Sequence, residues 1–213
     1  MASTKTATAY EAIKIKIIEG ELQPLGDISE DSLQKELGLS RTPIREACQR
    51  LSKEGFIYIY PSKGMIVAEV TADLIRDIYE MRLLNEPFIA AQSCRQNSSK
   101  DWIRALREKL ASPPSGLSEE AKRRYFIDID RTLHDGFLKD CKNRFLLSAM
   151  AIVLDHNHRI RIKVSHPYHG EDRSVIEHIG IIDAYLARDE AEVEHQMRHH
   201  IEESRKITFN NFF

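Results

Sequence analysis

Apolar side chains recur at the spacing of an α-helix along most of this chain. The first such stretch covers residues 7–19, and the second covers residues 29–37. A turn at residues 38–40 separates the second stretch from a third, which begins near Thr42 and ends near Gly55. Two short helices joined by a tight turn are typical of a helix–turn–helix unit. The pattern therefore predicts such a unit, with the first stretch packed against it.

After Gly55 the pattern becomes typical of β-strands. Residues 56–60 and 65–70 are rich in β-branched and aromatic side chains, and residues 61–64 read Pro-Ser-Lys-Gly, which favours a turn. We predict a hairpin that forms the wing of a winged helix. Lys63 at its tip is placed to reach a phosphate or the minor groove, although a solvated turn lysine is an equally ordinary reading.

From residue 71 onward no stretch is convincingly strand-like, and the remainder is predicted to be helical. A helix is expected to start at Thr71 and to be kinked or divided by Pro87. The later helices are separated by loops at residues 112–116 and 166–170. Their predicted ranges are 101–110, 119–140, 145–164, 173–187 and 190–206. The predicted fold is mainly α, with a winged helix-turn-helix domain at residues 1–70 and an all-α helical bundle at residues 71–213.

Composition narrows the class of protein. The 213 residues are 42% hydrophobic and 30% charged, which is typical of a soluble globular chain. The net charge of −2 gives no sign of nucleic-acid binding, so any such surface must be a local patch. The three cysteines are far apart and odd in number, which suits reduced thiols. With no membrane-length apolar run and no signal-peptide core, we expect a cytoplasmic protein that contacts no membrane.

A local cationic patch lies at the start of the third helical stretch, where residues 40–47 read Ser-Arg-Thr-Pro-Ile-Arg-Glu-Ala. Thr42 can cap a helix, and Pro43 suits its first position, where a missing N–H costs nothing. Arg41 and Arg45 are four residues apart and therefore project from one side of the helix start. A positive helix end with two arginines and a hydroxyl suits phosphates and base edges.

The motif residues around this helix start form a longer pattern. They are Tyr10, Ile13, Ile17, Gly20–Leu22, Ile28–Glu30, Leu33, Leu37–Ala47, Arg50, Leu51, Glu54–Phe56 and Gly64. This pattern resembles the GntR family of bacterial winged-helix transcription regulators, and the remainder resembles the all-helical effector domain of its FadR-like branch, the FCD type. The resemblance implies a ligand-responsive, sequence-specific regulator, expected to be a repressor. It also implies a homodimer whose two reading helices enter successive major grooves of a palindromic operator.

The resemblance and the residue types together assign DNA contacts. Arg45 is expected to read a base, with a guanine edge as the preferred partner. Arg41 and Thr42 are expected to hold phosphates or flanking bases. The full set of expected DNA-binding residues shares the helix start or the wing turn and comprises Ser40, Arg41, Thr42, Arg45, Lys63 and Gly64.

Four residues of the helical part have the spacing of a metal site. Asp130 and His134 are four apart and share one helix face. A helix corner is predicted at residues 188–189, and His178 and His200 lie at nearly equal distances before and after it. An antiparallel helical hairpin therefore brings these two side chains to the same level along the helix pair. One carboxylate and three imidazoles suit a divalent transition metal. Zinc is the expected ion, with nickel and manganese as alternatives.

Alternatives to this ligand set remain. The chain has nine histidines, and His156, His158, His195 and His199 lie near enough to compete. For any single histidine, a core or solvated role is more common than metal ligation. The pattern resembles the ligand positions of metal-containing FCD domains, and that resemblance favours His200 over its neighbour.

The resemblance also implies an effector site in the helical domain. Residues 79–86 are similar to the start of an FCD domain, where Arg82 is expected to face a cavity and bind a small carboxylate effector bidentately. Arg159 is a second candidate and Arg161 a third. For these two, a surface or interhelix salt bridge is the more ordinary role.

Two other functions fit parts of the pattern. A metal-dependent hydrolase with an accessory DNA-binding head would use the metal to activate water, but no general base stands out in a motif. There is also no nucleophile elbow, P-loop or dinucleotide fingerprint. A pure interaction protein would leave the histidines without a metal and use the helical domain only to dimerise. We therefore expect a regulator and not an enzyme.

Overall fold

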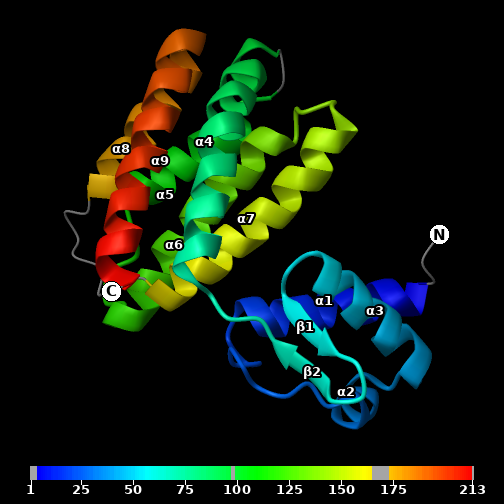
Figure 1. Ribbon diagram of the computed structural model, residues 1–213. Helices are drawn as coiled ribbons and strands as arrows, with labels where there is room; N and C mark the ends of the chain where they lie inside the picture. Colours follow the sequence, from blue (N-terminus) through cyan, green and yellow to red (C-terminus); the bar gives the residue numbers. More distant parts are fainter. Residues whose placement is uncertain (1–3, 97–98, 165–172, 213) are drawn as a thin grey trace. The chain divides into compact units, whose positions relative to one another are not determined.

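The computed structural model describes residues 4–96, 99–164 and 173–212. The chain forms two compact units, Met1–Thr71 and Ala72–Phe213 (Figure 1). The described residues are mostly helical, and their one sheet is a two-stranded hairpin in the first unit. This is the mainly α fold, with a small wing, that the pattern predicts.

The first unit is a winged helix. Its elements are α1 (Thr4–Ile18), α2 (Glu30–Leu37), α3 (Arg41–Lys53), β1 (Ile57–Tyr60) and β2 (Gly64–Val67). α1 packs against α3, and both contribute fully buried side chains to a common core, including Ile13, Ile44 and Leu51. This burial fixes α3 to the rest of the unit while its N-terminal turn remains at the surface.

Local chemistry sets the helix ends in this unit. Ser29 caps α2, because its hydroxyl accepts the N–H of Ser32 at 3.2 Å. Gly38 ends α2 with a φ of 63°, which is the left-handed conformation that glycine adopts without strain. The predicted cap of α3 is wrong by two residues. The cap residue is Ser40, and Thr42 and Pro43 are the second and third residues of the helix.

The hairpin forms as predicted but is shorter. β1 pairs antiparallel with β2, and Tyr58 faces Ile66 in the register. The turn between the strands uses positive φ angles at Ser62 (61°) and Gly64 (112°). A side chain at Gly64 would be strained for this reason, even though the space around it is open.

The second unit consists of helices in its described residues. Their bounds are α4 (Ala72–Arg95), α5 (Asp101–Ala111), α6 (Glu119–Leu138), α7 (Arg144–Val164), α8 (Arg173–Ala187) and α9 (Glu190–Phe212). α9 lies along α4 (Figure 1), and the Tyr79 hydroxyl joins them by hydrogen bonds of 2.8 Å to Ser204 and to Thr208. These hydrogen bonds therefore join the first and the last helix of the second unit.

Two predictions for this unit need correction. α4 is one helix and continues through Pro87, so the predicted division does not occur. α9 extends to Phe212, beyond the predicted end at residue 206. The corner before it is as predicted, because the Asp189 carboxylate accepts the Glu192 N–H at 3.0 Å. The loop predicted at residues 166–170 lies outside the described residues.

The three cysteines, Cys48, Cys94 and Cys141, are free thiols and all are buried. Burial raises the pKa of Cys48 to about 12, with a smaller contribution from Glu30. None of the described helices combines the length and the apolar character needed to cross a bilayer.

Candidate metal centre and DNA-reading surface

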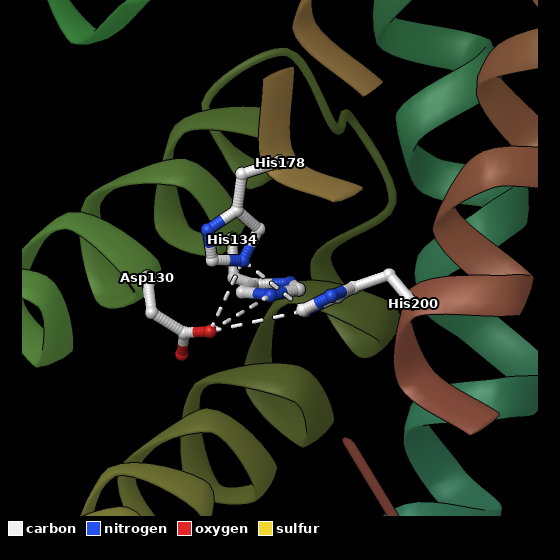
Figure 2. A group of neighbouring side chains, drawn as sticks. All are labelled: Asp130, His134, His178 and His200. Atoms are coloured by element: carbon white, nitrogen blue, oxygen red, sulfur yellow. Dashed lines mark hydrogen bonds and ion pairs between the residues drawn. The ribbon is translucent and has the colours of Figure 1, made fainter. Parts of the chain in front are cut away.

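Three helices of the second unit bring Asp130, His134, His178 and His200 together, and one ligand atom from each lies within 4.8 Å of the others (Figure 2). The first two residues share a face of α6, as their spacing predicts. The corner between α8 and α9, where Arg188 adopts a φ of 61°, brings the other two to one height. Their Nε2 atoms are 3.2 Å apart.

The ligand atoms surround one point. The Oδ1 atom of Asp130 lies 3.3 Å from Nε2 of His178 and 3.8 Å from Nε2 of both His134 and His200. All four side chains are buried. His199 is instead partly exposed, and its Nε2 is 3.4 Å from Arg173. The geometry thus selects His200 over its neighbour as the residue that faces this centre.

The protonation states suit metal ligation. Burial lowers the pKa of both His178 and His200, so each imidazole is neutral near pH 7 and keeps a nitrogen lone pair. Burial alone would raise the pKa of Asp130, but Arg161 and the hydrogen bond from His178 hold it well below its usual range. A charged carboxylate and neutral imidazoles are the forms that bind divalent metals.

Two glutamates orient the imidazoles. Oε2 of Glu86 accepts from Nδ1 of His134, and Oε2 of Glu177 accepts from Nδ1 of His200 at 3.0 Å. Protons on Nδ1 leave the Nε2 lone pairs directed at the centre, which is the usual arrangement behind metal-binding histidines. Sequence reasoning did not assign either glutamate a role. The position of Glu177 directly before His178 is a weak signal, and Glu86 comes from a different helix, α4.

Arg82 is engaged with protein groups on all three guanidinium nitrogens. Nε is 2.5 Å from Glu86, Nη1 is 2.7 Å from Oδ1 of Asn157, and Nη2 is 3.2 Å from Nε2 of His134. A metal at the centre would compete with Arg82 for the lone pair of His134. Of the other two candidate effector arginines, Arg159 is buried in α7, and Arg161 has its Nη2 3.7 Å from Oδ1 of Asp130.

The start of α3 presents its arginines at the surface of the first unit. The Arg41 and Arg45 side chains are 53% and 58% exposed. Both contact Glu30 at the start of α2, at 3.2 Å for Arg41 and 2.8 Å for Arg45, and Arg41 also contacts Asp31 at 2.7 Å. Exposed ion pairs are weak, so a phosphate can replace these acids. The two acids were not anticipated as partners of the arginines.

The other predicted DNA contacts surround the same region. The Ser40 hydroxyl makes no capping hydrogen bond, and Thr42 is exposed in the first turn. Lys63 and Gly64 lie in the exposed wing turn. A hollow of about 400 Å³ lies between α3 and the wing, and its lining includes Arg45, Gln49, Tyr60, Pro61 and Gly64. α3 and the wing therefore share one concave surface.

The first unit is a winged helix whose arginine-bearing helix start is exposed, and the chain continues into a helical bundle with a buried ligand cluster. This combination defines the class of DNA-binding transcriptional regulators. The family model for the FCD domain matches residues 77–203, and that for bacterial regulatory proteins of the gntR family matches residues 5–67. The chain belongs to the GntR family, in its branch with an FCD domain.

Individual relatives agree with this assignment. The HTH-type transcriptional regulator YdhC of Bacillus subtilis is 25% identical over 89% of this chain and 85% of its own length. The gluconate operon transcriptional repressor of B. subtilis is 35% identical over 88 residues, which are 41% of this chain and only 35% of that protein.

Solved structures share the fold. E. coli McbR/YncC superposes with a TM-score of 0.79 at 17% identity, covering 99% of both chains. The Zn2+-bound FCD domain of TM0439 superposes with a TM-score of 0.54 at 17% identity, covering 68% of this chain and 99% of that one. The predicted family is confirmed, and this chain is a regulator and not an enzyme, so the hydrolase alternative is set aside.

Proposed function

We propose that this protein is a homodimeric repressor that contains a divalent metal, binds a palindromic operator and responds to a small carboxylate. One observation carries the ligand-sensing part: four buried donor atoms from Asp130, His134, His178 and His200 converge within 4.8 Å. Such a set in a protein interior is costly unless an ion or hydrogen bonds satisfy it.

Zinc is the ion we propose, with nickel and manganese as alternatives. One carboxylate and three imidazoles match its ligand preferences, and Glu86 and Glu177 supply the supporting carboxylates behind two of the imidazoles. The Zn2+-bound FCD domain of TM0439 supports this choice, because it has the same fold. The ion would hold the effector's carboxylate through an open coordination position.

We assign DNA binding to the domain of residues 1–70. Arg45 reads a base in the major groove, and Ser40, Arg41 and Thr42 hold phosphates or flanking bases. Lys63 and Gly64 of the wing approach the neighbouring groove. The hollow between α3 and the wing supports this assignment, since it places Arg45 and the wing turn on one surface.

We assign effector sensing and dimerisation to the domain of residues 71–213. The effector shifts DNA affinity only as far as it prefers one arrangement of the dimer over another. An exposed apolar patch supports self-association of this domain. Leu84 and Phe88 lie one turn apart on α4, and Phe88 shares a surface hollow with Leu146, whose neighbour Phe145 is also exposed.

A paired measurement of metal content and DNA binding tests this proposal. The wild type should retain about one divalent ion per chain after dialysis, and His178→Ala with His200→Ala should lose it. His195→Ala is the control, because that side chain is 72% exposed and lies outside the centre. Equal metal content in all variants would refute the centre.

DNA binding is measured by gel shifts on the protein's own promoter. Arg45→Ala should weaken specific binding by roughly 1–3 kcal/mol and relax the preference at one operator position. Arg95→Ala removes an exposed arginine from the second unit and should leave binding unchanged. Unchanged specificity in Arg45→Ala would show that another residue reads the base.

A further inference from the structure

Arg161 lies at the edge of the metal centre with a guanidinium that the protein engages only in part. Its side chain is 19% exposed, and its Nη2 atom is 3.7 Å from Oδ1 of Asp130, which is longer than a hydrogen bond. Its Nε atom is buried and has no hydrogen-bond partner among the described residues. A buried N–H of a charged group without an acceptor is unfavourable, so this donor marks a place for one.

Arg82 provides an internal comparison. It contacts His134 of the same cluster, is fully buried, and has a protein partner for each of its three nitrogens. Those contacts with Glu86, Asn157 and His134 make it a positioning residue for the cluster. An incoming anion would have to displace them, whereas Nε of Arg161 needs no such displacement.

The two arginines approach different ligands of the centre. Nη2 of Arg82 is 3.2 Å from Nε2 of His134, whereas Nη2 of Arg161 is 3.7 Å from Oδ1 of Asp130. Arg161 therefore approaches the centre from the side of Asp130.

The charge around the centre also favours an anion. Asp130, Glu86 and Glu177 supply three negative charges, and Arg82, Arg161 and Arg173 supply three positive charges. A divalent ion at the centre adds two positive charges to this balanced set. The buried Arg159 on the same helix as Arg161 adds to the positive side. A net positive charge in a protein interior is unfavourable unless a counter-ion accompanies it.

We propose that Arg161 is the residue that binds the effector's carboxylate beside the metal, in place of Arg82. The Nε edge of its guanidinium receives a carboxylate oxygen in the paired geometry that arginine favours. This inference rests on the proposed metal centre and its small carboxylate ligand, and it names the residue that binds that ligand. Arg82 then keeps its role in orienting His134 through Glu86.

The test uses the full-length protein loaded with Co2+, whose visible absorption reports changes in coordination, and acetate as the probe. Wild type should give a saturable spectral change with acetate. Arg161→Met, which keeps much of the length but not the charge, should bind acetate at least tenfold more weakly while retaining Co2+. Arg104→Met, an exposed arginine on α5, is the matched control and should behave as wild type.

The outcomes separate the inference from the proposed function. A wild type that binds no Co2+ refutes the metal centre, and this inference falls with it. Co2+ binding with equal acetate affinity in wild type and Arg161→Met overturns the role of Arg161 alone. A wild type that ignores acetate, or binds inorganic phosphate more tightly, overturns the assignment to carboxylates.

Arg161→Lys covers the case in which Arg161→Met loses its fold or its metal, as judged by circular dichroism and metal analysis. Lysine keeps the charge but lacks the planar pair of donors. The proposal requires this variant to hold Co2+ and to bind acetate more weakly than wild type does. Wild-type acetate affinity in Arg161→Lys would show that charge alone is needed and would overturn the paired geometry.

Discussion

At the scale of single residues, acids on α2 pair with the two arginines that we propose to contact DNA. Asp31 is exposed and holds Nη2 of Arg41 at 2.7 Å. Asp31→Asn removes a charge that competes with phosphate and repels the duplex. We expect a severalfold gain in affinity for any DNA sequence, measured by gel shift at fixed salt. Glu36→Gln is the control, because Glu36 lies on the same helix but pairs with Lys16.

Glu177 is predicted to matter through the imidazole that it orients. Its Oε2 atom is 3.0 Å from Nδ1 of His200, and Arg173 lies 3.1 Å from its other oxygen. Glu177→Gln keeps the shape but removes the charge, so zinc affinity should fall by roughly 10- to 100-fold in a competition titration with a chelating dye. Glu203→Gln disrupts another ion pair of Arg173 and should leave zinc affinity as it is.

At the scale of elements, α6 approaches α5 closely because Gly136 has no side chain. A Cβ at this position would overlap the ring of Trp102, which also packs edge-on against Phe137 and Tyr185. The overlap in Gly136→Ala should therefore lower the free energy of unfolding by about 1–3 kcal/mol. The higher helix propensity of alanine offsets roughly 1 kcal/mol of this loss. The fluorescence of Trp102, the single tryptophan of the chain, reports the transition in urea.

Gly180 provides the contrasting case. It lies in α8, and an added Cβ would meet only the end of the flexible Gln196 side chain, at 3.3 Å. Gly180→Ala should be neutral or slightly stabilising. A loss of stability as large as that of Gly136→Ala would contradict the role given to close helix packing.

Periodicity predicts the elements well because buried faces recur every three to four residues, as in α8, whose predicted and observed ranges agree. It misplaces the start of α3, since Ser40, Thr42 and Pro43 are all acceptable near a helix N-terminus. The spacing of Asp130 and His134 follows from one helix and is readable in sequence. The contact of Glu86 with His134 cannot be read from the sequence, because it depends on how α4 packs against α6.

At the scale of the whole molecule, the proposed dimer requires an interface, and the exposed apolar patch of the second unit can provide one. Leu84 is 75% exposed, Phe88 55% and Phe145 73%. If this patch is the dimer interface, Phe88→Glu should bury a charge there and raise the dimer dissociation constant at least tenfold, as measured by sedimentation equilibrium. Ile15→Glu, an exposed apolar position in the first unit, is the control. An unchanged dimer in Phe88→Glu would place the interface elsewhere.

Because Cys48, Cys94 and Cys141 are all buried, the native chain offers no accessible thiol to a maleimide or a nitroxide reagent. A label would therefore attach only where a cysteine is introduced on purpose. Lys63→Cys in the exposed wing turn would carry one spin label per subunit. In the proposed dimer, pulsed electron resonance on that variant would then follow the separation of the two wing tips as metal and carboxylate are added, without first removing any native cysteine.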